Sequence, residues 1–197
     1  MDVYPNCLKK LISQFCSLPG IGKKTAERLS IHVLNSNKDK INEFSLALND
    51  LKDSIEVCDI CFCFIENNNC HICNDTSRDN SLICIVKDPT DIFLIEKSGF
   101  KGKYHVLGGL ISPLDGVAPE NLNIDTLIKR LNDIDEIIMA IDPSNEGDIT
   151  ILYLTDIIKK ENIKISRLAR GIPVGSSLEF IDEVTLTYSI NDRVEMK

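Results

Sequence analysis

The sequence predicts a multi-domain protein that joins an all-α part to an α/β part. Apolar residues recur at helical spacing near the N-terminus, four cysteines gather in a short segment, and continuous apolar runs alternate with helical patterns further on. We expect a helical N-terminal domain, a small four-cysteine module, an α/β domain with a mostly parallel sheet, and a short C-terminal segment. Their boundaries are placed at residues 1–55, 56–76, 80–170 and 171–197.

Length and composition narrow the functional classes. A chain of 197 residues is long enough to bury about 70% of its unfolded surface. It has no apolar stretch long enough to span a bilayer, and its first residues, 1–5, contain no apolar leader. These features predict a cytoplasmic protein with no membrane role.

Charge is divided unevenly along the chain. The net charge of -8 argues against nucleic acid as a ligand of the whole chain, because phosphate binding needs an excess of lysine and arginine. Residues 1–34, however, carry five basic side chains and two acidic ones, so this segment is +3 and the remainder is -11. A basic head on an acidic body predicts two separate roles.

The N-terminal segment predicts a helix, a tight turn and a second helix. Apolar residues at i, i+3, i+4 and i+7 indicate the first helix, which is expected to end near Ser17. The segment Leu-Pro-Gly-Ile-Gly at 18–22 follows it and predicts the turn. The apolar positions of the first helix are Leu8, Leu11, Ile12 and Phe15, and those of the second helix are Ala26, Leu29 and Val33. A later stripe is expected in the intrachain core rather than in a dimer seam; it comprises Ile41, Phe44, Leu48, Leu51 and Ile55.

The turn between these helices carries candidate phosphate-binding groups. Glycines at 20 and 22 allow close approach of the backbone and leave the amides of the next helix free to face a phosphate. With adjacent basic side chains, the segment resembles a helix-hairpin-helix motif, which implies sequence-independent binding of the DNA backbone. The candidate residues are Gly20, Gly22, Lys23, Lys24 and Arg28. The alternative is an ordinary αα-turn with a solvated basic face.

Four cysteines form the most constrained chemistry in the chain. They have the spacing C-x2-C-x8-C-x2-C, which lets two tight turns aim four thiolates at one point, the ligand set that Zn²⁺ prefers. The predicted ligands of this structural zinc are Cys58, Cys61, Cys70 and Cys73. Two disulfides are the alternative, and a reducing cytosol favours the metal.

The other cysteines divide by context. Cys7, Cys16 and Cys84 lie in helical or apolar patterns and are expected to be small core residues. Cys63, two residues past Cys61, and His71, between the second pair, are alternative metal ligands in principle. The regular spacing favours the four.

Apolar runs at 82–86 and 137–141 predict strands covered on both faces, as in a parallel sheet. One stripe at helical spacing lies between these runs and a second lies after them. The first comprises Ile124, Leu127, Ile128 and Leu131, and the second comprises Ile149, Leu152, Tyr153 and Ile157. The short run at 178–182 is interpreted as a structural strand end, because no phosphate-binding Gly-rich loop accompanies it.

Carboxylates cluster after the second of these strands. Asp142, Glu146 and Asp148 fall at the carboxyl edge of the sheet, where ligands of such sheets bind. The cluster resembles the acidic corner of a Toprim domain, whose catalytic members hold a divalent metal with a glutamate and a D-x-D pair. Here Lys87, followed by Asp88, replaces the glutamate, and Ser144 replaces the second aspartate. The corner is therefore predicted to contact a partner or to bind Mg²⁺ weakly, or else its carboxylates complement a helix N-terminus.

The order of these parts resembles the RecR family of bacterial recombination mediators over nearly the whole chain. Further matching segments are 83–86, 107–109, 112–116, 146–147 and 171–175. The resemblance implies a non-catalytic DNA-repair protein that acts with RecO and RecF to load RecA onto single-stranded DNA coated by its binding protein. It also implies a homo-oligomer, a dimer or a tetrameric ring that encircles DNA.

Two other functions compete with this adaptor. One is a Mg²⁺-dependent phosphoryl-transfer enzyme that uses Asp142 and Glu146, against which Lys87 and Ser144 count. The other is a zinc-held protein-interaction module with no DNA role. An acidic body suits recruitment of a basic protein, as the resemblance supposes for RecO.

Overall fold

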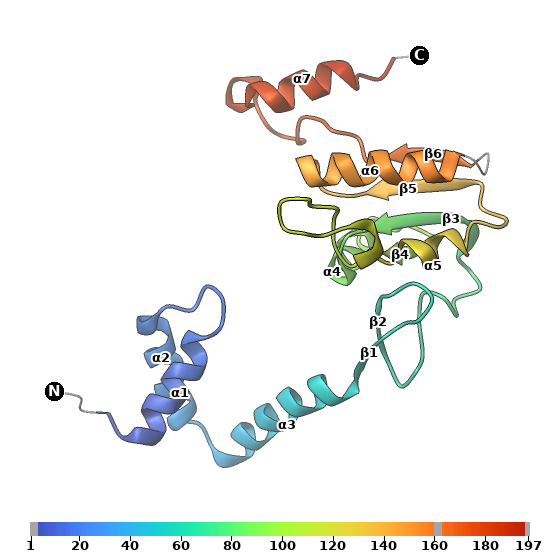
Figure 1. Ribbon diagram of the computed structural model, residues 1–197. Coiled ribbons are helices and arrows are strands. Elements are labelled where there is room, and N and C mark those ends of the chain that lie inside the picture. The colour runs from blue at the N-terminus through green and yellow to red at the C-terminus, as the bar shows by residue number, and fades with distance from the viewer. Residues whose placement is uncertain (1–3, 160–162, 196–197) are drawn as a thin grey trace. The chain divides into compact units, whose positions relative to one another are not determined.

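The computed structural model describes residues 4–159 and 163–195 (Figure 1). The chain divides into two compact units, Met1–Ile55 and Glu56–Lys197. Residues 1–3, part of the start at which the sequence predicts no leader, lie outside the described residues. Within the described residues, no helix is long and apolar enough to cross a membrane.

The first unit is helical. Helix α1 (Asn6–Cys16) packs against α2 (Lys23–Leu34), and α3 (Lys38–Ser54) follows. The buried positions of the α1 and α2 pair are Ile12, Ala26 and Ser30. At the start of α3 the Asn37 side chain accepts a hydrogen bond from the Lys40 amide at 2.9 Å, the usual N-cap interaction. The predicted helix, turn and helix are confirmed.

Two expectations for this unit are wrong. No residue of α3 is buried, and Phe44, Leu48 and Leu51 each expose more than half of their surface. The predicted intrachain core is therefore not formed along most of this stripe: Ile41 is half-buried, and Ile55, just past α3, is exposed. Cys7 and Cys16 are also exposed rather than core residues: they lie near the two ends of α1, whereas its buried residue, Ile12, lies near the middle.

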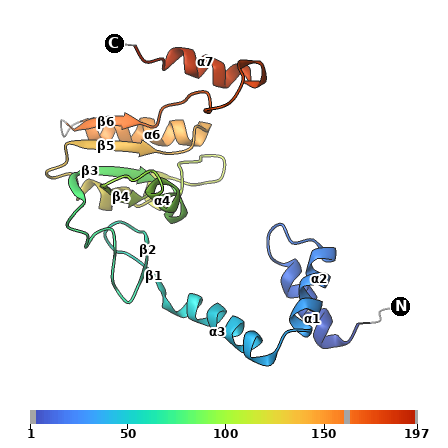
Figure 2. The ribbon, with the colours of Figure 1, turned by 180° about the vertical axis from the view of Figure 1, so that it is seen from behind.

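The second unit is built on a parallel sheet with strand order β4-β3-β5-β6. The strands are β3 (Asp79–Val86), β4 (Gly102–Val106), β5 (Glu136–Ala140) and β6 (Lys164–Arg167), and all three pairings are parallel. The predicted strands correspond to β3 and β5, which lie side by side in the centre of the sheet. Helices α4 (Pro89–Glu96), α5 (Ile124–Ile128) and α6 (Asn145–Ile158) and the short η1 (Pro119–Asn121) occur between strands. Figures 1 and 2 show α6 along one side of β5 and β6.

Alternation along β3 separates two cores. Ile83 and Ile85 face a core completed by α5 and α6, whereas Cys84 and Val86 face a second core. The second core contains Ile92 of α4, together with Cys58, Cys61, Cys63, Cys70 and Ile72 of the cysteine segment. Residues 58–73 are therefore part of the covering of one sheet face.

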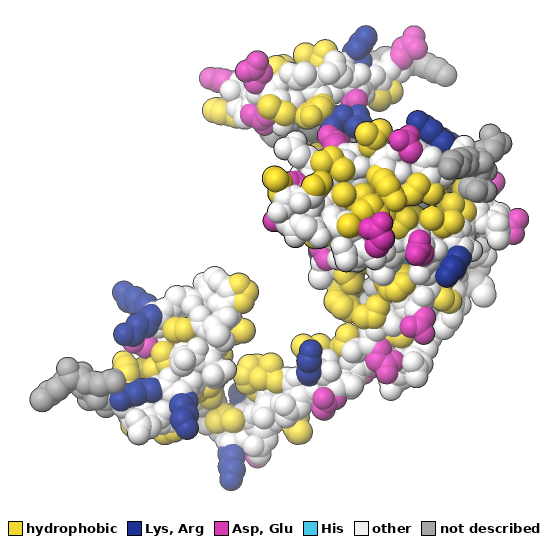
Figure 3. All heavy atoms as spheres, viewed as in Figure 1, with side chains coloured by type: hydrophobic (Ala, Val, Ile, Leu, Met, Phe, Trp, Pro, Cys, Tyr) yellow, Lys and Arg dark blue, Asp and Glu magenta, His cyan; other side chains and the backbone are white. Residues whose placement is uncertain are grey.

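The stripe predicted for α6 is on the wrong face. The helix buries Thr150, Leu154 and Ile158, whereas Ile149, Leu152 and Tyr153 are exposed. Helix α6 is apolar on more than one face, so periodicity by itself does not say which face meets the sheet. Figure 3 shows hydrophobic side chains gathered on the side of this unit along which α6 runs.

The C-terminal segment is helical. A short η3 (Leu178–Phe180) precedes α7 (Glu183–Asn191), and the Asp182 carboxylate accepts a hydrogen bond from the Thr185 amide at 2.8 Å. That bond holds the pKa of Asp182 below its usual range. The expected strand end is wrong: Asp182 is structural, but it is the N-cap of a helix, as its spacing from Thr185 indicates.

Candidate metal centre and nucleic-acid interface

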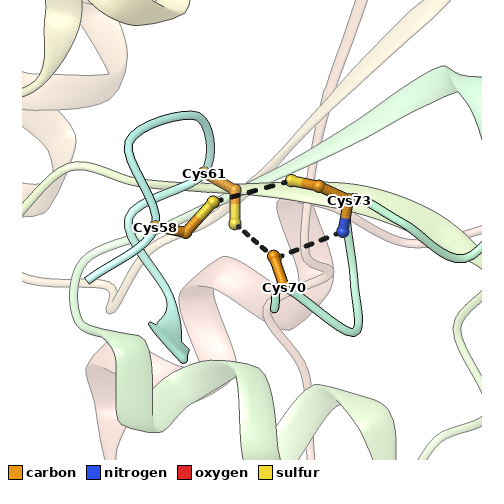
Figure 4. A group of neighbouring side chains, drawn as sticks. All are labelled: Cys58, Cys61, Cys70 and Cys73. Atoms are coloured by element: carbon orange, nitrogen blue, oxygen red, sulfur yellow. Dashed lines mark hydrogen bonds between the residues drawn. The ribbon is translucent and has the colours of Figure 1, made fainter. Parts of the chain in front are cut away.

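The four predicted metal ligands converge in space. The Sγ atoms of Cys58, Cys61, Cys70 and Cys73 all lie within 4.8 Å of one another (Figure 4). Sγ of Cys58 is 3.9 Å from Sγ of Cys73, and Sγ of Cys61 is 3.6 Å from Sγ of Cys70. A tetrahedral Zn²⁺ with Zn–S bonds of about 2.3 Å needs S···S edges of about 3.8 Å. All four are free thiols, and the two disulfides considered as the alternative are not formed.

Local backbone geometry suits thiolates. The Ile60 amide donates to Sγ of Cys58 at 3.4 Å, and the Cys73 amide donates to Sγ of Cys70 at 3.3 Å. Without a cation, burial raises the pKa of the Cys70 thiol, and hydrogen bonding to Cys63 raises that of Cys61. A divalent cation reverses this preference by stabilising the thiolates directly. The donor set therefore fits a soft divalent metal.

Two cations of the α/β unit hold the cysteine turns. Buried Lys103 of β4 donates from Nζ to the carbonyls of Ile72, Cys73 and Asp75 at 2.9, 3.1 and 2.9 Å. The Arg130 guanidinium donates to the carbonyls of Ile60 and Tyr104 at 3.1 and 2.9 Å. These positive charges lie beside a site that would carry two net negative charges with Zn²⁺ bound, so they both orient the turns and offset the charge.

The two alternative ligands have different surroundings. His71 is exposed, and the described group of converging ligand atoms consists of the four cysteines. Cys63 is buried, with its Sγ 3.2 Å from that of Cys61 and 3.4 Å from that of Cys70. A strand, β2 (Phe64–Glu66), begins at the next residue and pairs with β1 (Ile55–Val57), which leads into the cluster.

His105 is a buried, neutral histidine that contacts both Arg130 and the core. Its Nε2 lies 2.8 Å from the Asn123 carbonyl oxygen, and its Nδ1 lies 2.9 Å from Nη1 of Arg130. A carbonyl only accepts and a guanidinium only donates, so Nε2 carries the proton and Nδ1 accepts. The ring is fully buried, and burial lowers the pKa of His105 to about 4.

This buried histidine predicts a loss of stability in acid. The unfolded chain binds the proton with a pKa of about 6.5 and the folded chain resists it, so stability is full above that pH and falls towards pH 4. The free energy of unfolding, measured with urea at about pH 7 and about pH 4.5, should fall between these two values by about 2.5 kcal/mol more in the native sequence than in His105→Gln. His32→Gln, at an exposed position, should keep the native slope. Equal slopes for all three proteins would contradict a buried neutral histidine.

The predicted DNA-binding residues surround one turn in the first unit. The Ile21 amide bonds the Leu18 carbonyl at 3.1 Å, and Gly20 has a φ of +78°, which is the left-handed position of a type II turn with proline before it. Gly22 is the N-cap of α2 and has no side chain to occupy the amides of the first turn. Among the described residues, Lys23, Lys24 and Arg28 are exposed and form no ion pair. Figure 3 shows dark blue side chains on this unit.

The acidic corner has structural partners for several of its groups. Ser144, at the place of the second catalytic aspartate, caps α6 by accepting a hydrogen bond from the Gly147 amide at 3.0 Å. Asp148 lies 3.7 Å from Arg170, and Lys87 lies 3.6 Å from Asp88. A Cβ atom at Gly147 would clash with the Asp142 carbonyl, which accounts for the glycine. In residues 4–159 and 163–195, Asp142, Glu146 and Asp148 do not form a converging ligand group.

Comparison with known proteins agrees with these parts. Residues 8–52 match the family described as RecR, helix-hairpin-helix, residues 81–169 match the Toprim domain, and residues 171–194 match RecR, C-terminal. The recombination protein RecR of Staphylococcus haemolyticus (strain JCSC1435) is 47% identical over 98% of this chain and 99% of its own length. This chain belongs to the RecR family. The recombination protein RecR of Staphylococcus aureus (strain Mu3 / ATCC 700698) is 46% identical over the same shares of the two chains.

Membership of the RecR family supports a role in recombination and repair. Sequence reasoning located the cysteines and the basic turn of this RecR chain but missed Lys103 and Arg130, which support the candidate metal site from 30 or more residues away. The sequence offered only a weak signal for Lys103, namely a lysine within the segment Gly-Lys-Tyr-His-Val at 102–106. In the structure this segment is entirely buried. A buried lysine needs acceptors, and the ends of two cysteine turns offer unpaired carbonyls.

Proposed function

We propose that this chain is a non-catalytic, DNA-binding recombination mediator that works in DNA repair in the cytoplasm. The helix-hairpin-helix at 18–28 contacts the DNA backbone without reading sequence, and Zn²⁺ on the four cysteines stabilises the α/β unit. We retain the division into parts 1–55, 56–76, 80–170 and 171–197 as part of this proposal. The observation that carries it is that Lys23, Lys24 and Arg28 are exposed at the open N-terminus of α2 and form no ion pair with any residue that the structure describes.

The acidic unit has a different part in this proposal. With a net charge of -11 outside residues 1–34, that remainder repels phosphate and suits a basic partner protein. By resemblance to the family, this partner is RecO, acting with RecF so that RecA loads onto single-stranded DNA coated by its binding protein. Asp142, Glu146 and Asp148 are the proposed contact residues at the sheet edge.

We further propose that the chain forms a homo-oligomer, a dimer or a tetrameric ring. The exposed apolar stripe of α3 supports this, because a contiguous apolar helix face in water favours a protein partner. The family resemblance suggests that such an assembly encircles DNA.

The proposal is tested by DNA binding over a series of salt concentrations, with and without purified RecO, together with mass measurement in solution. Three phosphate contacts per protomer predict an affinity about 40-fold weaker at about 200 mM salt than at about 50 mM. RecO should increase the amount of complex, and the mass should exceed that of one chain. No shift of single-stranded or duplex DNA at the lowest salt would instead favour a zinc-held interaction module with no DNA role.

A Mg²⁺-dependent phosphoryl-transfer enzyme is the second candidate, favoured by the Toprim match at 81–169. Ser144 as a helix cap, Asp148 beside Arg170 and the positive Lys87 count against it. In the same binding reactions, plasmid DNA with Mg²⁺ should stay intact. Nicking that disappears in Glu146→Ala would establish the enzyme and overturn the adaptor.

A further inference from the structure

The cysteine cluster contains one thiol more than a four-coordinate metal needs. Sγ of Cys63 lies 3.2 Å from Sγ of Cys61 and 3.4 Å from Sγ of Cys70, and the residue is only 5% exposed. Both separations are shorter than the S···S edge of about 3.8 Å in a tetrahedral Zn²⁺ site. Cys63 therefore lies beside the edge that joins two candidate ligands, close enough to reach the same ion after a small movement.

The backbone holds Cys63 in this position. The Cys58 amide donates to the Cys63 carbonyl at 2.9 Å, and the Phe62 amide donates to the Cys58 carbonyl at 2.9 Å, so the turn from 58 to 63 is closed twice. Phe62 has a φ of +61°, which is uncommon for a bulky side chain. Its ring packs edge-on against His105, with centroids 5.5 Å apart. The reversal at Phe62 brings the sulfurs of Cys61 and Cys63 to one side of the chain.

Packing in the apolar core accounts for the position of Cys84 but not for the position of Cys63. Cys84 belongs to the same core and is also buried. Among the described residues, its sulfur makes no hydrogen bond to another thiol. Cys63 contacts two of the four ligands of the proposed metal site, and a sulfur in that place is a donor atom at the edge of the coordination sphere.

We infer that Cys63 is a reserve metal ligand that can replace Cys61 or Cys70. This inference rests on the proposed metal site. In the exchange the Cys63 S–H bond breaks and its proton goes to solvent, a metal–sulfur bond forms to Cys63, the bond to the departing cysteine breaks, and that sulfur takes up a proton. The metal stays divalent and no electrons are transferred. The site then tolerates loss of Cys61 or Cys70, but not of Cys58 or Cys73, which have no fifth thiol beside them in the described structure.

Binding of Co²⁺ to the purified full-length chain tests this inference, because the d–d and sulfur-to-cobalt bands report how many thiolates are bound. Cys61→Ser and Cys70→Ser should keep a four-thiolate spectrum and an affinity within about 10-fold of the native protein. Cys58→Ser and Cys73→Ser should show three thiolates. Adding Cys63→Ser to either tolerant variant should weaken binding by about 100-fold or more, whereas Cys63→Ser by itself should keep four thiolates.

Several outcomes would overturn the inference in distinguishable ways. If Cys61→Ser and Cys61→Ser with Cys63→Ser have the same three-thiolate spectrum and affinity, Cys63 is a core residue and the four-cysteine site still stands. The Cys70→Ser pair repeats the comparison independently should the Cys61 variants fold poorly. A native protein that binds no Co²⁺ would overturn the metal site and the reserve ligand together.

Discussion

Replacement of Cys58 by serine is expected to lower the melting temperature of the second unit by about 10 °C or more. Cys58, Cys61, Cys70 and Ile72 belong to the core on the β3 face that also contains Cys84 and Val86. Loss of the metal therefore removes the constraint on residues 58–73 and uncovers one face of a central strand. We take the loss at about 4 kcal/mol or more, since structural zinc sites supply about 10–16 kcal/mol in isolated fingers and part of this core is independent of metal.

The chain offers a matched control for this substitution. Cys16→Ser makes the same change of thiol to hydroxyl at an exposed position outside the cluster and should leave the melting temperature within about 1 °C, as surface substitutions do. A strong chelator should reproduce the Cys58→Ser result in the native protein. Melting that is insensitive to the chelator, after zinc removal has been confirmed by elemental analysis, would refute the structural role of the metal.

Hydrogen exchange should show where the structure opens first. Without metal, residues 56–76 should exchange fastest, followed by the β4 amides, because the Val106 amide donates to the Cys61 carbonyl at 2.9 Å. Helices α5 and α6 cover the opposite face through Leu127, Leu154 and Ile158 and should stay protected. Uniform exchange across both faces would mean that the unit unfolds as a whole rather than through the cysteine segment.

Charge reversal of Lys23 and Lys24 to glutamate is expected to weaken DNA binding by about 30-fold or more at about 100 mM salt. Both lysines lie at the start of α2, where the amides of the first turn have no capping side chain. The variant loses two phosphate contacts and adds two negative charges at the same place, so the slope of log affinity against log salt should also fall by about 2. Fluorescence anisotropy with labelled single-stranded and duplex DNA measures both quantities.

Lys38→Glu with Lys40→Glu is the matched control. These lysines lie in the first turn of α3, in the same unit, and both are exposed, so the net charge changes equally without touching the turn at 18–22. Equal weakening by the two double variants would show that a diffuse charge, not the turn, attracts DNA. Unchanged affinity in Lys23→Glu with Lys24→Glu would remove the turn from the DNA site altogether.

Local patterns were sufficient for much of this fold. The spacing of Leu8, Leu11 and Ile12 predicted α1, and Pro19 with Gly20 predicted the turn, because period and turn chemistry are properties of neighbouring residues. The unbroken apolar runs predicted the central strands β3 and β5, because a strand that is buried on both faces has no polar face. The four cysteines were predicted as candidate metal ligands because the spacing of such ligands is set by residues close together in the sequence.

Errors occurred where a residue's environment depends on distant segments. Helix α6 is apolar on more than one face, and it packs on the sheet through Leu154 and Ile158 rather than through Leu152 and Tyr153. Strand β4 was missed because its lysine and histidine suggest a surface. Both are buried, since Lys103 bonds carbonyls of the cysteine turns and His105 bonds Asn123 and Arg130. Partners of this kind lie too far along the chain for a local pattern to reveal them.

The sequence by itself determined the family resemblance, the order of the parts, the four candidate metal ligands and the basic turn, because each is encoded by residues within a short span. Only the tertiary structure decided which sheet face the cysteine segment covers, that Lys103 and Arg130 bond to the carbonyls of its turns, and that the Sγ atom of Cys63 lies within 3.4 Å of those of two candidate ligands. Those relations depend on packing between segments whose contacts a linear pattern does not specify.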